Sequence, residues 1–325
     1  MTVISDVAVE LMQARRARVA EKRRLSCDTV DLRLELCEGG LNGLEAGAHV
    51  DVHLPGGLVR QYSVWDWSPA GDCVNIAVKY EASGRGGSQA VHALEQGNLV
   101  YVGGPRNNFR LDDRPVHKIL IAGGIGATPI VPMARRLVER GAAFQLYYVV
   151  RSGAHAAMDA AFRALHLPAT YQLHCTDADG RFDIMRIMAS APAGSDVYAC
   201  GPDSMLKAIL ENEKLLRGGK VHLERFAVSS EAEQSVSQAF EIELASSGAV
   251  FRVGEDQTVL EVLRQNGMQV SAGCTEGLCG SCIVDVVSGD IDHRDSVLSE
   301  EEQAANEFMC TCVSRARSKK LVLRL

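Results

Sequence analysis

The chain has 325 residues, 46% of them hydrophobic and 23% charged, which is the composition of a globular protein with material for two or three cores. No run reaches the roughly 20 apolar residues of a membrane span, and the first residues lack the basic start of a signal peptide, so we expect a cytoplasmic location without membrane association. The net charge is −7, and residues 229–325 carry 16 acidic against 8 basic side chains. That imbalance argues against nucleic-acid binding and favours a basic protein partner, although an acidic face that only improves solubility explains it equally well.

Residues 1–111 predict an antiparallel β-barrel. Short segments that often alternate apolar and polar residues are separated by glycine and proline turns. They lie at 30–36, 49–54, 62–67 and 74–80. The basic segment 15–24 is expected to be a solvent-exposed first strand, and one helix is expected to begin at Ser88.

Residues 112–228 predict a doubly wound parallel sheet, because strand and helix patterns alternate strictly. The expected strands are 118–122, 144–150, 171–175 and 196–200, and the expected helices are 128–140, 155–164, 183–189 and 203–216. Residues 229–239 are small and polar and predict a linker. Residues 240–325 predict a third domain, with strands at 240–244, 250–253, 283–287 and 321–325 and a helix at 258–265.

The strongest chemical pattern is a group of four cysteines, Cys274, Cys279, Cys282 and Cys312. Three thiolates on one short, glycine-containing loop can surround a compact anionic cluster, and their C-x4-C-x2-C spacing is that of plant-type [2Fe–2S] ligation. The alternatives are unligated thiols or a structural zinc ion, which more often uses paired C-x2-C units. Cys310 competes for the fourth position because residues two apart on a strand face the same way, and the spacing favours Cys312.

A second pattern predicts a flavin site in the barrel. Arg60 and Tyr62 share one face of a strand, where a ring beside a positive charge suits an anionic aromatic ligand. The segment GRGGS, residues 84–88, precedes a helix and offers backbone N–H groups and the Ser88 hydroxyl to a phosphate. An ordinary strand tyrosine and a flexible glycine hairpin are the alternatives.

A third pattern predicts a dinucleotide site at the carboxyl ends of the parallel strands. The segment GGIGATP, residues 123–129, follows a buried strand, and CGPD, residues 200–203, ends another. The first segment is not the G-x-G-x-x-G fingerprint, and Cys200 is equally well explained as a core residue.

Taken in chain order, the R-x-Y-S strand at 60–63, the GRGGS loop, the GGIGATP turn, the CGP strand end and the cysteine loop resemble the phthalate dioxygenase reductase family, within the ferredoxin–NADP reductase-like superfamily. The segments 105–109, 292–295 and 312–316 also resemble that family. The resemblance implies a flavin-binding barrel, an α/β domain for NAD and a C-terminal β-grasp ferredoxin domain. It also implies FMN rather than FAD, because the GRGGS loop ends on a phosphate and no adenine platform follows.

The resemblance also implies residue roles. Ser63, Thr128 and Cys200 would be the catalytic positions, with Thr128 near the flavin N5, and Phe226 would cover the flavin ring unless it packs between domains. The expected cluster ligands are Cys274, Cys279, Cys282 and Cys312, and the expected cofactor contacts are Arg60, Tyr62, Ser63, Val78, Lys79, Gly86, Gly87, Ser88, Gly123, Gly124, Gly126, Thr128, Cys200, Gly201, Pro202 and Phe226.

The implied activity is electron transfer from NADH through FMN and the [2Fe–2S] cluster to a Rieske-type oxygenase, a dioxygenase or O-demethylase of aromatic degradation. A flavin is required because it accepts two electrons together and releases them singly. One alternative is a reductase for a di-iron or haem monooxygenase, in which the ferredoxin domain often comes first. Another is a non-enzymatic [2Fe–2S] redox sensor or electron-transfer scaffold. NADH is expected to be preferred over NADPH. The residues that could reverse this preference are Arg151 and Ser152, which follow the second strand of the sheet, where the 2′-phosphate of NADPH could be held.

Overall fold

The computed structural model describes residues 14–166, 170–226, 238–278 and 280–325. The chain divides into two compact units, Met1–Glu224 and Arg225–Leu325. Of the predicted linker, only Gln238 and Ala239 lie within the described residues. No helix in the described ranges is long and apolar enough to cross a bilayer.

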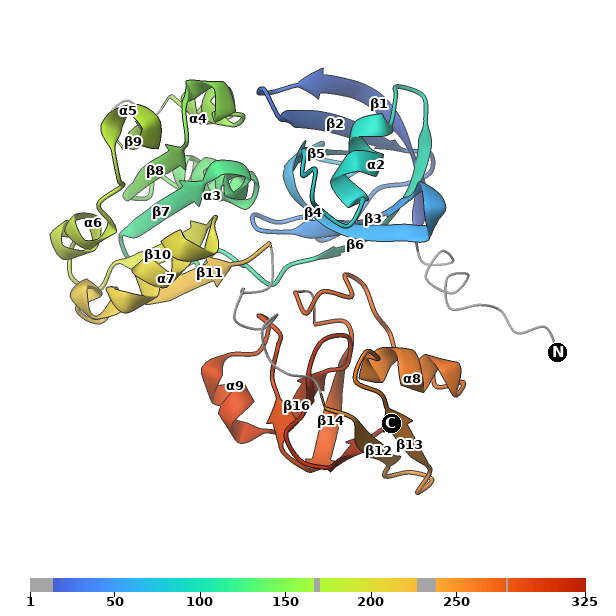
Figure 1. Cartoon of the computed structure of the whole chain (residues 1–325). Coiled ribbons are helices and arrows are strands. Elements are labelled where there is room, and N and C mark those ends of the chain that lie inside the picture. Colours follow the sequence, from blue (N-terminus) through green and yellow to red (C-terminus); the bar gives the residue numbers. More distant parts are fainter. Residues whose placement is uncertain (1–13, 167–169, 227–237, 279) are drawn as a thin grey trace. The chain divides into compact units, whose positions relative to one another are not determined.

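Six antiparallel strands close into a barrel in the order β1-β2-β5-β4-β3-β6 (Figure 1). Their bounds are Arg15–Arg24 (β1), Thr29–Leu36 (β2), His49–Leu54 (β3), Leu58–Trp67 (β4), Cys73–Lys79 (β5) and Leu99–Arg106 (β6). In β1, Ala17 and Val19 are buried while Arg16 and Arg18 face solvent, so the predicted exposed basic strand is confirmed. The barrel is filled by aliphatic side chains, to which the short helix α2 (Gly87–Ala93) contributes Val91.

A parallel sheet in the order β11-β10-β7-β8-β9 follows in the same unit. Its strands are Lys118–Gly123 (β7), Phe144–Val150 (β8), Tyr171–Cys175 (β9), Asp196–Cys200 (β10) and Val221–Glu224 (β11). Every residue of β7 is buried, as expected for a parallel strand covered on both faces. The chain runs outward from β7 in one direction and from β10 in the other, so the topological switch point lies between these two strands.

The helices of this sheet partly correct the sequence expectation. They are Ala127–Glu139 (α3), Asp159–Arg163 (α4), Thr176–Asp179 (α5), Ile184–Ser190 (α6) and Asp203–Glu211 (α7). The helix predicted over 155–164 is a 3-10 turn at Gly153–His155 and then α4, because Ala156 has the non-helical backbone angles φ −82° and ψ 58°. The helix predicted over 203–216 likewise ends at Glu211 and is followed by a separate 3-10 turn.

The barrel and the parallel sheet share a buried contact. Trp65 and Ala77 of the barrel lie in the same hydrophobic cluster as Ala127 and Ile130 of α3. Asp66 of β4 also forms a 2.7 Å ion pair with Arg135 of α3. Strand β4, which carries the predicted flavin residues, therefore continues directly into the contact with the helix that follows the glycine turn.

The second unit is a five-stranded mixed sheet in the order β13-β12-β18-β14-β16, with a separate β15-β17 pair. Its elements are Phe240–Leu244 (β12), Val250–Val253 (β13), Val259–Gln265 (α8), Ile283–Ser288 (β14), Ile291–Asp292 (β15), Glu300–Ala305 (α9), Phe308–Cys310 (β16), Arg315–Ala316 (β17) and Lys320–Arg324 (β18). The first and last strands pair in parallel, and α8 begins with a capping box made by Thr258 and Glu261. Buried faces of α8 and the sheet form one core. This is the predicted β-grasp arrangement.

Candidate functional site

The glycine turn and the CGP strand end meet at the switch point of the parallel sheet. A side chain at Gly123 would put its Cβ 2.6 Å from Pro202 Cδ, and one at Gly126 would lie 2.3 Å from the carbonyl oxygen of Cys200. A Cβ at Gly201 would lie 2.8 Å from Gly123 Cα. Both segments therefore require glycine for close backbone approach, and this edge is where open α/β sheets bind ligands.

Thr128 and Cys200 are buried at this edge. The Thr128 hydroxyl donates to the carbonyl of Ile125 at 3.0 Å, which closes the turn that starts α3. The Cys200 thiol is fully buried, and its pKa is raised by burial and by the nearby Glu224. Cys200 is thus held as a neutral thiol, suited to positioning a ligand rather than to nucleophilic chemistry.

Glu224 was not identified from the sequence. It lies beside Cys200 in the register of β10 and β11, and its Oε2 atom is buried without a hydrogen-bond partner among the described residues. Burial raises the pKa of this carboxyl to about 8. The sequence held no local signal for it, because only the register of the short strand β11 on β10 brings Glu224 to Cys200. Phe226, two residues later, is 41% exposed and belongs to the other unit.

On the barrel, the structure places Arg60 against the GRGGS loop. Arg60 donates to the backbone carbonyl of Arg85 at 2.8 Å, so its guanidinium holds the GRGGS loop. A Cβ at Gly87 would lie 2.6 Å from Arg60 Cγ, and Gly86 has a φ of +80°. Both glycines are therefore needed to form the loop under the arginine.

Ser63 and Ser88 differ in their hydrogen bonding. The Ser63 side chain is buried on β4, and its hydroxyl has no hydrogen-bond partner within the described part of the chain. Ser88 accepts from the Glu81 N–H at 3.0 Å and lies 3.3 Å from the Glu81 carbonyl, so its hydroxyl already closes the loop. Ser63 is thus the hydroxyl with hydrogen-bonding capacity left for a ligand.

The three remaining barrel positions are less directly available. The Val78 side chain lies in the barrel core, and its carbonyl oxygen is 2.9 Å from Nε2 of His92. Lys79 forms a 2.6 Å ion pair with Glu81. The half-buried Tyr62 packs against the barrel core.

The cysteine loop places sulfur atoms and N–H groups together. Cys274 Sγ accepts from the N–H groups of Glu276 at 3.2 Å and of Leu278 at 3.4 Å. Cys282 Sγ lies 3.2 Å from Cys312 Sγ, and both thiols are buried. N–H groups aimed at sulfur are what a cluster of thiolates requires. Cys279 lies outside the described residues.

The expectation that Cys310 and Cys312 share one strand was wrong. Strand β16 ends at Cys310, and Cys312 lies in the following turn. Hydrogen bonding with both thiols lowers the pKa of Cys282, and Cys310 has the larger effect. The Cys312 sulfur also accepts a hydrogen bond from the N–H of Gly277 and interacts electrostatically with Cys274, whereas Cys310 interacts with Asp295. Cys312 is therefore the one that faces the loop.

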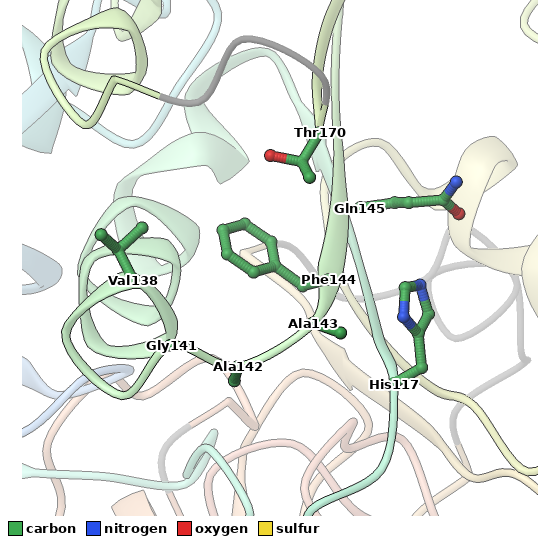
Figure 2. A pocket seen from close by; sticks show the side chains of 8 residues that line it. All are labelled: His117, Val138, Gly141, Ala142, Ala143, Phe144, Gln145 and Thr170. Carbon is green, nitrogen blue, oxygen red and sulfur yellow. The ribbon is translucent and has the colours of Figure 1, made fainter.

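A separate cavity opens at the amino ends of the parallel strands (Figure 2). It lies where β8 begins, beside the turn after α3, so it is remote from the carboxyl ends of the strands. It is lined by His117, Val138, Gly141, Ala142, Ala143, Phe144, Gln145 and Thr170. Its position at the amino ends of the strands excludes it as the dinucleotide site.

Comparison with known proteins agrees with this arrangement. Residues 16–111 match the oxidoreductase FAD-binding domain, and residues 242–317 match the 2Fe-2S iron-sulfur cluster binding domain. The chain is 37% identical to a vanillate O-demethylase oxidoreductase of a Pseudomonas species, over 94% of this chain and 98% of that protein.

Two solved structures are similar over nearly the whole chain. The structure of phthalate dioxygenase reductase, described as modular for electron transfer from pyridine nucleotides to [2Fe-2S], is 34% identical with a TM-score of 0.73, over 96% of this chain and 98% of that one. Full-length CYP116B46 from Tepidiphilus thermophilus is 35% identical with a TM-score of 0.80 over 97% of this chain. The present chain spans only 42% of that cytochrome P450 chain.

Proposed function

Because the chain belongs to the phthalate dioxygenase reductase family, and is thus an oxidoreductase with flavin- and [2Fe–2S]-binding domains, we propose that it moves electrons from NADH through FMN and a [2Fe–2S] cluster to a Rieske-type oxygenase. The observation that carries this proposal is the convergence of Cys274, Cys282 and Cys312 in the same chain as the glycine-built switch point. A flavin bound here would supply two-electron acceptance from hydride, and a [2Fe–2S] cluster held by these cysteines would supply one-electron transfer.

The residues present fit a flavin monophosphate. Arg60 holds the GRGGS loop, Gly86 and Gly87 let the backbone approach the phosphate, and the Ser63 hydroxyl is buried with unused hydrogen-bonding capacity. Beyond the loop, Gln89 folds back to the Ala82 carbonyl at 2.9 Å, which favours a ligand that ends at its phosphate. Chromatography of the flavin released by denaturation distinguishes FMN from FAD.

The chain's residues position the nicotinamide and do not move protons. Gly123, Gly126 and Gly201 form the surface for the nucleotide, and Thr128 and the neutral thiol of Cys200 lie at its inner end. Hydride transfer demands correct placement and exclusion of water rather than a protein acid or base.

The proposed cluster ligands are Cys274, Cys279, Cys282 and Cys312. The test is a pair of variants, Cys312→Ser and Cys310→Ser, assayed for iron content, flavin reduction by NADH and cytochrome c reduction. Cys312→Ser is expected to lose the iron and the cytochrome c activity while NADH still reduces the flavin. Cys310→Ser, a change of the same kind two residues away, is expected to keep both. Full cytochrome c reduction by an iron-free variant would refute the proposed path.

The second candidate acceptor is a haem monooxygenase. It is supported by the similarity to a cytochrome P450 chain over 97% of the present chain, which includes the C-terminal ferredoxin domain. The C-terminal position of the ferredoxin domain was expected to argue against a haem partner. The similarity to this P450 chain removes that argument. Reduction of purified Rieske oxygenase and of a P450 haem domain, compared under NADH, decides between the two acceptors.

A further inference from the structure

A second group of side chains of the metal-ligating types lies apart from the cysteine loop and from the carboxyl ends of the parallel strands. Cys27 and Asp28 lie in the turn between β1 and β2, and His155 ends the 3-10 turn that follows β8. The Cys27 sulfur, a carboxylate oxygen of Asp28 and a ring nitrogen of His155 all lie within 4.8 Å of one another. Neither the flavin site nor the nucleotide site uses these residues.

Backbone hydrogen bonds hold this group in place. The N–H groups of Leu25 and Ser26 donate to the Thr29 carbonyl at 2.9 and 3.3 Å and close the β1–β2 turn. The Cys27 N–H donates to the carbonyl of Ala154, the residue before His155, at 3.1 Å. Two segments more than 120 residues apart in the sequence are thus fixed against each other at this position.

The side chains are oriented by further hydrogen bonds. Asp28 Oδ1 accepts from the Ser26 hydroxyl at 2.8 Å and from the Thr29 hydroxyl at 3.0 Å. Ser152 Oγ lies 2.9 Å from Nδ1 of His155, which fixes the ring and leaves Nε2 for another ligand. Metal-binding histidines and carboxylates are usually supported in this way.

We propose that Cys27, Asp28 and His155 form a binding site for a borderline divalent metal ion, of which Zn²⁺ is the representative. A thiolate, an imidazole and a carboxylate are the three ligand types that zinc takes in proteins. Tetrahedral zinc ligands lie about 3.3–3.8 Å apart, as follows from their bond lengths, so small side-chain movements complete the site. Cys27 is exposed, and water supplies the fourth ligand. The Arg24 side chain, which donates to the Cys27 carbonyl, is the nearby positive charge that opposes binding.

The test uses the full chain with flavin and cluster loaded, so that the cluster cysteines are occupied. Equilibrium dialysis against Zn²⁺, with iron and zinc counted together, is expected to give one zinc per chain in addition to the cluster iron. Cys27→Ser and His155→Ala are each expected to weaken zinc binding at least about tenfold. Cys37→Ser removes another exposed thiol of the same barrel and is expected to leave zinc binding unchanged.

A second readout identifies the ligand itself. Co²⁺ bound to the loaded protein is expected to give a thiolate charge-transfer band in the difference spectrum, absent from Cys27→Ser and present in Cys37→Ser. Iron content and flavin absorbance show whether each variant is folded and loaded. Zinc binding that is equal in the wild type and in both Cys27→Ser and His155→Ala would overturn the proposal, as would equal losses in Cys27→Ser and Cys37→Ser.

Discussion

The buried hydroxyl of Ser63 is the residue whose environment points most directly to a ligand. A buried polar group without a partner costs stability, and replacing it by an apolar group removes that cost. We therefore expect Ser63→Ala to leave the thermal midpoint of the flavin-free protein unchanged or slightly higher. The same change is expected to weaken flavin binding or slow hydride transfer about tenfold, the value of one hydrogen bond. Flavin titration and stopped-flow reduction by NADH measure the two effects.

Ser88, on the GRGGS loop, provides a control for this prediction. The Ser88 hydroxyl bonds to the backbone of Glu81, so Ser88→Ala is expected to lower the thermal midpoint of the flavin-free protein. If Ser63→Ala instead destabilised the flavin-free protein and left flavin affinity intact, Ser63 would be a structural residue.

The carboxyl of Glu224 predicts a pH-dependent stability. Its pKa is raised to about 8 by burial, from 4.5 in the unfolded chain. The unfolded state therefore loses its proton first, and stability falls as the pH rises from about 4.5 to about 8. Because the residue as a whole is only half-buried, we expect this loss to be about 1–3 kcal/mol rather than the full value of the shift.

Glu224→Gln tests this directly. The variant cannot ionise, so it is expected to match the wild type near pH 4.5 and to exceed its thermal stability at pH 8. Both tryptophans of the chain, Trp65 and Trp67, lie in the same unit as Glu224, and their fluorescence follows the unfolding of that unit. A constant difference between variant and wild type at every pH would contradict the assignment.

At the scale of elements, local patterns predicted most of the strands but missed those that are short or interrupted by glycine and proline. Strand β2 alternates apolar and charged residues and β8 is rich in aromatic and β-branched residues, and the bounds of both were predicted to within about one residue. Strand β6 was missed because Gly103, Gly104 and Pro105 lie within it. Strand β11 was missed because it is only four residues long and gains its stability from pairing with β10.

The candidate site divides in the same way. Motifs that are contiguous in the sequence, such as GRGGS and the cysteine loop, were found directly. The partnership of Cys200 with Glu224 depends on the register of two parallel strands, which no local pattern encodes. The same holds for the approach of Cys27 to His155, which depends on how the β1–β2 turn meets the loop after β8.

The loop after β8 allows a prediction on nucleotide preference. Arg151, at the position expected for a 2′-phosphate, lies 3.6 Å from the carboxylate of Asp177, which follows β9. Asp177 neutralises the arginine and would repel a phosphate, in keeping with a preference for NADH. Asp177→Asn is expected to raise the ratio of kcat/KM for NADPH to that for NADH about two- to fivefold, since exposed ion pairs are worth less than about 1 kcal/mol.

Arg151→Ala supplies the opposite change. It is expected to lower the use of NADPH while altering that of NADH little, because only the 2′-phosphate distinguishes the two nucleotides. An unchanged ratio in both variants would mean that the 2′-position binds elsewhere.

At the scale of the whole molecule, the two compact units carry different charge. Residues 225–325 hold 16 acidic and 9 basic side chains, whereas residues 1–224 carry 25 acidic and 25 basic ones. Long-range electrostatic forces therefore attract positively charged partners to the cluster-bearing unit and repel negatively charged ones, and they are weak at the nucleotide-binding unit. A division of this kind suits a protein that must accept a small nucleotide at one unit and meet a protein at the other.

This division predicts which of the two half-reactions responds to salt. Raising the ionic strength from about 20 mM to about 500 mM shortens the screening length several-fold, so the second-order rate of reduction of cytochrome c, a basic protein, is expected to fall about tenfold. Reduction of the flavin by NADH, followed in the same protein without an acceptor, is expected to change much less. Ferricyanide, an anionic acceptor, serves as the matched control. If it takes electrons from the acidic unit, its reduction is expected to speed up with salt, because salt screens the repulsion between the two. An identical salt response for the cationic and the anionic acceptor would show that the acidic unit does not guide the encounter, and that its charge serves only to keep the surface solvated.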